Sequence, residues 1–178
     1  MNSADLTLML GNLSQSLLSV QRLITGLAYL LGLVFIFISL QKLKNVASSG
    51  GHSQEKIFSP MAYMLFGAAL LFLPSAIKVM ANSAFGVGNV LSYASYQPYN
   101  VIDSMGIIIV TMGVVWFIRG CVLLAHASQP GVQEGPKGFM FVCAGVLAIN
   151  FDNTVSMINT LMLHFTNITL AVRDAKGY

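Results

Sequence analysis

Charged side chains are scarce in this sequence. Lys and Arg together contribute nine residues and Asp and Glu six, so only 8% of the 178 residues are charged. A soluble domain carries roughly 25%. Hydrophobic residues make up 56% of the chain. This composition predicts a protein that resides in a membrane.

A long polar segment is also missing. A folded domain needs at least about 50 residues, and no polar stretch approaches that length, which excludes a large enzymatic head. The net charge is +3, but no cluster of Lys and Arg resembles a nucleic-acid footprint. We therefore expect no direct nucleic-acid binding.

Residues that commonly perform chemistry are few and scattered. The histidines lie in separate segments without metal-site spacing, and there is no catalytic Ser/His/Asp order or phosphate-binding glycine loop. We expect no enzyme activity and no cofactor. Cys121 and Cys143 fall in apolar blocks and are interpreted as small buried hydrophobes. The alternative is a disulfide between them, which requires that their side of the membrane is oxidising.

The apolar residues gather in four long blocks, and about 18 or more such residues match the hydrocarbon core of a bilayer. We predict an all-α membrane protein with four transmembrane helices arranged as two tandem hairpins. The predicted segments are the first hairpin at 23–81, a connecting segment at 82–104, the second hairpin with an amphipathic extension at 105–165, and a polar tail at 166–178.

Local signals refine these segments. Pro74 predicts a kink in the second span, and the Ser/Gly/Pro-rich residues 45–60 and 126–137 are predicted loops. Tyr93, Tyr96 and Tyr99 are typical of a membrane–water boundary, with a specific aromatic binding surface as the alternative. Loop charges weakly favour cytoplasmic loops and external termini.

Residues 1–22 are predicted to form an amphipathic helix, because leucines recur every three or four residues opposite a face of Asn, Ser and Gln. Such a helix lies in the membrane interface or packs on a neighbouring subunit. The sequence leaves both alternatives open.

The two halves of the chain can be aligned. Gly32-Leu-Val-Phe-Ile aligns with Gly113-Val-Val-Trp-Phe, and Gly67-Ala-Ala-Leu-Leu-Phe-Leu-Pro aligns with Gly145-Val-Leu-Ala-Ile-Asn-Phe-Asp. With two spans in each half, the repeat would be parallel. Identities are few and apolar segments align easily, so the alignment suggests a duplication without establishing it.

Five glycines are candidate helix-packing residues, because small residues let helix backbones approach closely in lipid. Their spacing of seven places them on one helical face in each span. They serve either an oligomer interface or packing within one subunit. These residues are Gly106, Gly113 and Gly120 in the third span, and Gly138 and Gly145 in the fourth.

Two basic residues stand inside the predicted spans, where charges are costly and usually face protein or water. Arg119 either snorkels to the membrane surface, pairs with an acid of another helix or subunit, or lines an aqueous path. Lys78 is expected on the same side of the membrane as Asp103 and Asp152, and either acid is a possible partner.

The fourth span carries a resemblance to a known family. The segment Gly138-Phe-Met-Phe-Val-Cys-Ala-Gly-Val-Leu-Ala-Ile-Asn-Phe-Asp-Asn-Thr-Val, and most specifically Gly145 to Val155, resembles small inner-membrane proteins of type IVB secretion systems. These are the IcmC/DotE-like proteins of Dot/Icm machines and the TraQ-like proteins of plasmid conjugation systems. With the layout of spans, the resemblance covers about residues 15–170.

The resemblance implies a non-enzymatic, multi-pass subunit of the bacterial inner membrane. Its partners would be membrane lipid and other secretion-system membrane subunits, in a homo-oligomer or a large hetero-complex. No catalytic residue carries over. The polar run that contains Asn150 and Asp152 would suit a subunit contact or an aqueous path, or it simply ends a span.

Two other functions remain open. One is a pilin-like subunit that leaves the membrane and polymerises, since conjugative pilins are also small helical hairpins. The other is a small channel or transporter subunit in which Arg119 and Lys78 line a polar path.

Overall fold

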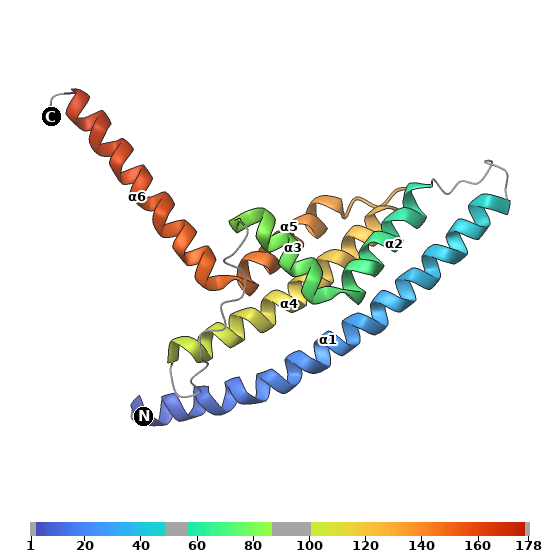
Figure 1. Ribbon diagram of the computed structural model, residues 1–178, viewed down its shortest axis with the longest axis horizontal. Helices are drawn as coiled ribbons and strands as arrows, with labels where there is room; N and C mark the ends of the chain where they lie inside the picture. Colours follow the sequence, from blue (N-terminus) through green and yellow to red (C-terminus); the bar gives the residue numbers. More distant parts are fainter. Residues whose placement is uncertain (1–2, 49–56, 87–100, 177–178) are drawn as a thin grey trace.

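The computed structural model describes residues 3–48, 57–86 and 101–176, and in these residues every regular element is an α-helix (Figure 1). The all-α prediction is therefore confirmed for this part of the chain. The helices are α1 (Ser3–Ser48), α2 (Phe58–Leu71), α3 (Leu73–Phe85), α4 (Val101–Ala127), α5 (Gly135–Ile149) and α6 (Phe151–Lys176). The tyrosines Tyr93, Tyr96 and Tyr99 lie outside the described residues.

Helix α1 is continuous through the point where a separate N-terminal helix was expected to meet the first span. It contains 46 residues and no proline, which corresponds to a length of about 69 Å at 1.5 Å per residue. Without a residue that interrupts the hydrogen-bond ladder, residues 3–22 and the first span form a single helix. A separate amphipathic helix is thus not confirmed.

The second apolar block is broken into two helices. The axes of α2 and α3 are bent by 100° relative to each other. Phe72, between them, has φ −105° and ψ 41°, and Pro74 lies in the first turn of α3, where its missing N–H costs nothing. The kink predicted at Pro74 is thus a sharp corner, such as occurs in a broken span or a re-entrant segment.

Three described helices, α1, α4 and α6, are long and apolar enough to cross a membrane, and the bent pair α2–α3 would make a fourth. This supports a multi-pass membrane protein. The fourth span differs from the prediction: α5 has 15 residues, about 22 Å, which is short for a hydrocarbon core of about 30 Å. The long helix is α6, which continues through residue 166, where the polar tail was expected to begin.

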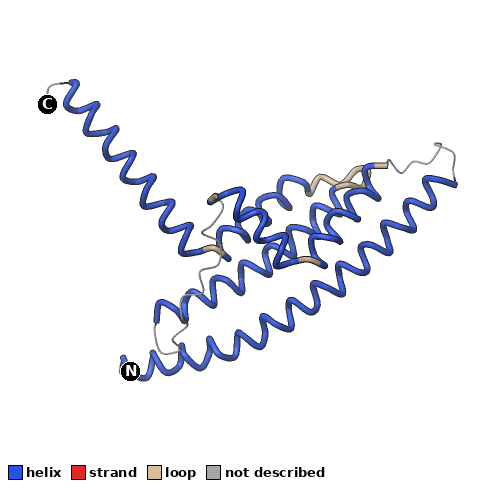
Figure 2. The backbone as a smooth tube through the Cα atoms, viewed as in Figure 1, coloured by secondary structure: helices blue, strands red, loops and turns tan. Residues whose placement is uncertain are grey.

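The helices form two similar halves, which we call the first half (α1–α3) and the second half (α4–α6). Within each half the long helix packs on the next one, α1 on α2 and α4 on α5, and the halves meet chiefly through α1 and α2 against α4. Figure 1 shows α1 and α4 running side by side in the same direction. Figure 2 shows α6 leaving the bundle at an angle.

One apolar core joins the halves. It includes Phe35 of α1, Tyr63 and Leu70 of α2, and Phe117 and Cys121 of α4. In the first half, α3 also buries Leu73, Ile77 and Ala81. In water, burying a large apolar side chain stabilises a fold by about 1.5–3 kcal/mol. Inside lipid this gain is absent, and close packing of the helices against one another drives their association instead.

The parallel arrangement predicts that both hairpin loops lie on one side of the membrane. We expect Ala47→Cys and Gln133→Cys, each placed in a chain with alanine at both native cysteines, to react with an impermeant maleimide from the same side. Asn12→Cys, at the other end of α1, is the control and should react from the opposite side. Labelling of Ala47→Cys and Gln133→Cys from opposite sides would contradict the arrangement.

Candidate functional site

Helices α4 and α5 touch backbone to backbone at glycines. A Cβ atom placed on Gly145 would lie 2.7 Å from the backbone nitrogen of Phe117 and 2.8 Å from the carbonyl oxygen of Gly113. A Cβ on Gly113 would lie 2.9 Å from the backbone nitrogen of Ile149. Real Cβ atoms do not approach backbone atoms this closely, so both positions require glycine for α4 and α5 to pack as they do.

The same contact continues toward the hairpin loop. A Cβ on Gly120 would lie 2.9 Å from the carbonyl oxygen of Gly138, and a Cβ on Gly138 would lie 3.0 Å from the backbone nitrogen of Leu124. Gly106 differs, because nothing lies within 4 Å of its added Cβ. Four of the five candidate glycines therefore lie where α4 and α5 pack against each other within the chain, and Gly106 lies outside this contact.

The first half contains a matching contact that was not among the candidate site residues. A Cβ on Gly32 would lie 2.8 Å from the carbonyl oxygen of Gly67. Farther along, the Ser39 hydroxyl donates a hydrogen bond of 2.7 Å to the carbonyl oxygen of Pro60. The repeat alignment pairs Gly32 with Gly113 and Gly67 with Gly145, and its extension pairs Ser39 with Gly120 and Pro60 with Gly138. This alignment was the signal that could have located the contact.

The two halves also share the break that ends their second hairpin helix. The alignment pairs Phe72 with Asn150. Their backbone angles agree, with φ −105° and ψ 41° at Phe72 and φ −104° and ψ 48° at Asn150. The Phe72 N–H donates to Ala68 at 2.9 Å, and the Asn150 N–H donates to Val146 at 3.1 Å. This shared local geometry supports a duplication of the helix–loop–helix–break unit.

At the second break, polar side chains satisfy carbonyl groups that the interrupted ladder leaves without a helical donor. The buried Asn150 amide adds a second bond of 2.9 Å to the carbonyl of Val146, which already accepts the Asn150 N–H. The Thr154 hydroxyl donates to the carbonyl of Leu147 at 2.7 Å. Asp152 is exposed in the first turn of α6, where the helix dipole favours a negative charge. These residues therefore end one helix and begin the next.

The two basic residues have different surroundings. The Arg119 guanidinium lies 5.0 Å from the ring centroid of Phe141, a distance typical of a cation–π contact. Lys78 is exposed on α3, and within the described residues it forms no ion pair with Asp103 or Asp152. The acid pairing proposed for Lys78 is thus not formed in the structure.

Tyr63 is the polar centre of the contact between the halves. Its hydroxyl accepts a hydrogen bond of 2.7 Å from the Gln129 amide. Its ring packs edge-on to Phe35 at 5.4 Å, and the Lys42 ammonium lies 5.6 Å from the ring centroid. The Ser59 and Ser128 hydroxyls are 3.4 Å apart beside it. The cluster has no local sequence signal, because its members come from three separate segments.

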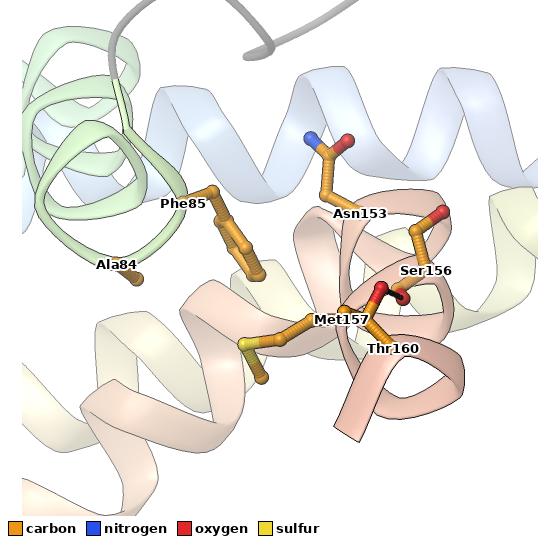
Figure 3. A pocket seen from close by; sticks show the side chains of 6 residues that line it. All are labelled: Ala84, Phe85, Asn153, Ser156, Met157 and Thr160. Atoms are coloured by element: carbon orange, nitrogen blue, oxygen red, sulfur yellow. Dashed lines mark hydrogen bonds between the residues drawn. The ribbon is translucent and has the colours of Figure 1, made fainter. Parts of the chain in front are cut away.

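A cleft of about 270 Å³ separates the end of α3 from the start of α6. Figure 3 shows Phe85 of α3 and Met157 of α6 on its two sides, with Asn153, Ser156 and Thr160 along α6.

Among the described residues, no group of three or more His, Cys, Asp or Glu side chains is placed to hold a metal ion. Cys121 and Cys143 are free thiols.

Comparison of the chain with known protein families, with curated proteins and with solved structures finds no match.

Because of the glycine contact, we expect two glycine-to-alanine substitutions to differ strongly in their effect on the free energy of unfolding. Gly145→Ala places a methyl group against the backbone of α4 and should lower the free energy of unfolding by about 1–3 kcal/mol through overpacking. Gly106→Ala is the control, because open space surrounds that position, and its effect should stay within about 1 kcal/mol. An SDS titration in detergent micelles measures both values. Equal effects would show that α4 and α5 do not meet at Gly145.

Removal of the Tyr63 hydroxyl should lower the stability by less than the upper value expected for Gly145→Ala. Tyr63→Phe removes the acceptor of the Gln129 hydrogen bond and should cost about 1 kcal/mol of stability. Tyr29→Phe is the matched control, because Tyr29 is exposed and its hydroxyl has no hydrogen-bond partner in the described part of the chain. The same SDS titration applies, and a loss confined to Tyr29→Phe would contradict the role given to Tyr63.

Proposed function

We propose that this chain is a non-enzymatic integral membrane subunit of a bacterial type IVB secretion or conjugation apparatus, located in the inner membrane, where it contributes to assembly of the translocation machine. The resemblance of Gly145–Val155 to the IcmC/DotE-like and TraQ-like proteins supports the choice of machine. The observation that carries the assembly role is the exposed helix α6.

Helix α6 leaves the bundle and makes almost no contact with the rest of the described chain. Its segment Phe151–Arg173 is apolar enough to span a membrane, yet none of it is buried. Large side chains such as Leu163 and Phe165 are about two-thirds exposed, at 66% and 65%. A helix with so much apolar surface must be covered by lipid, by protein or by both.

Polar side chains on α6 favour a protein partner along part of this helix. Asn159, His164 and Asn167 are exposed, and in the described residues they have no hydrogen-bond partner. Thr160 and Thr166 instead bond to carbonyl groups of their own helix. An unsatisfied amide in hydrocarbon costs several kcal/mol, and side chains of this kind often bond across helices in membranes. A neighbouring subunit would supply those bonds.

A pilin-like self-assembling subunit is the second candidate. The observation that favours it is the tandem arrangement of two hairpins with the same glycine contact and the same break. Recovery of the chain in sheared extracellular filaments would support this function, whereas retention of all the chain in the membrane fraction would oppose it.

The test is purification of the tagged chain in mild detergent from the cells that make it, with mass spectrometry of the co-purifying proteins. We expect membrane proteins of a secretion or conjugation core. In the variant Asn159→Leu/His164→Leu, their yield should fall by about tenfold if these residues bond to a partner, since tenfold corresponds to the loss of one or two hydrogen bonds.

The matched control is Met162→Leu/Leu163→Met, which changes neighbouring exposed positions without altering polarity. It should retain the partners. Purification of the chain alone from its own host would contradict the proposed role, and equal losses in both variants would remove the argument from the polar side chains.

A further inference from the structure

The two halves contact each other through different surfaces of the same repeated unit. The first half contributes a groove between α1 and α2, which we call the first groove. Its members, Phe35, Ser59, Ala62 and Tyr63, are between 1% and 6% exposed. They are covered because the second half packs there: His126 and Gln129 contact Tyr63, and Ser128 contacts Ser59.

The second half contributes one side of α4, which we call the α4 ridge. Thr111, Val114 and Cys121 on this side are at most 5% exposed, and Val114 and Cys121 share the apolar core with Phe35 and Tyr63. The intramolecular interface is thus of the head-to-tail kind, with a groove on one unit and a ridge on the other.

The repeat alignment places a second groove on the second half. The members of the first groove align, in order, with Trp116, Lys137, Met140 and Phe141. These four residues, together with Ala144, line an open and almost wholly apolar groove of about 400 Å³ between α4 and α5. Trp116 is 41% exposed and Met140 67%. No part of the described chain covers this second groove.

The alignment also places a second ridge, on α1. Thr111, Val114 and Cys121 align with Leu30, Leu33 and Leu40, which are 60%, 45% and 53% exposed. Phe37, aligned with Ile118, is 64% exposed and lies on the same side. The α1 ridge is therefore apolar and left uncovered by the described residues, although the aligned side of α4 is buried.

We infer that copies of this chain associate head to tail, with the α1 ridge of one copy in the second groove of the next. The interface inside the chain shows the aligned pair, the first groove against the second half, whereas the second groove and the α1 ridge are both left uncovered by the described chain. A head-to-tail interface of this kind generates a closed ring or an open filament, not a two-fold dimer. This inference does not depend on which machine the chain serves.

A second copy fits better than lipid alone for a specific reason. The aligned first groove is filled by the second half of the chain, not by lipid. Apart from Lys137 at its edge and Arg119 stacked on Phe141, the second groove presents apolar side chains. The α1 ridge is uncharged from Leu30 to Leu40, so no charge is buried against another of the same sign.

The intramolecular interface fixes a contact that can be tested. The Ser59 and Ser128 hydroxyl oxygens are 3.4 Å apart, and these serines align with Lys137 and Ala47. Cysteine at Lys137 of one copy should therefore lie within disulfide range of cysteine at Ala47 of the next, since disulfides need Cβ atoms about 3.5–4.5 Å apart.

The experiment uses full-length chains in native membranes, with alanine at Cys121 and Cys143. Lys137→Cys and Ala47→Cys are placed on separate chains with different tags, co-expressed and oxidised. We expect a mixed disulfide that carries both tags. When both cysteines are on one chain, a ladder of multimers should form. Ser59→Cys/Ser128→Cys is the positive control, which should close within one chain without a ladder.

Two further variants test the ridge. Phe37→Ala should reduce the mixed disulfide by about tenfold, through lost apolar packing. Phe139→Ala is the control and should have no effect, because Phe139 aligns with Met61, which is 63% exposed and lies outside the first groove. If the positive control forms but the mixed disulfide does not, or if Lys137→Cys links only to itself, the head-to-tail association is overturned.

Discussion

The close backbone contact between the first two helices of each half is the interaction on which the rest of the structure depends. In lipid, apolar side chains gain little by leaving their surroundings, so helix association requires tight packing. Gly32 against Gly67, and Gly113 against Gly145, let the helix backbones approach within contact distance. The Tyr63 cluster between the halves joins side chains from these two hairpins.

The helix breaks determine how each half ends. Phe72 and Asn150 adopt the same backbone geometry, so both halves turn at the aligned position. The two turns have different consequences because the helices after them meet different surroundings. Helix α3 finds other helices of the bundle and buries Leu73, Ile77 and Ala81, whereas α6 finds no such neighbour among the described residues. The same local unit thus produces a packed helix in one half and a projecting helix in the other.

The aligned surfaces of the two halves therefore differ in how far they are covered by the described chain. A surface covered by the next unit in the first half is left open in the second, as the pairs Phe35 and Trp116 or Ala62 and Met140 show. In a membrane protein, such surfaces are covered by lipid or by another protein. The second groove and the α1 ridge are such surfaces, and α6 is likewise exposed along its length.

The sequence by itself determined the membrane class, the helical content, the apolar blocks and the alignment of the halves, because these depend on composition and local periodicity. It also indicated the packing glycines, whose spacing puts them on one face. It could not show that α1 is continuous, that the chain turns by 100° at Phe72, or that α6 is the longer helix after Asn150. Those outcomes depend on which helix faces meet, and only the tertiary structure decided that Tyr63 is covered while the aligned groove beside Phe141 stays open.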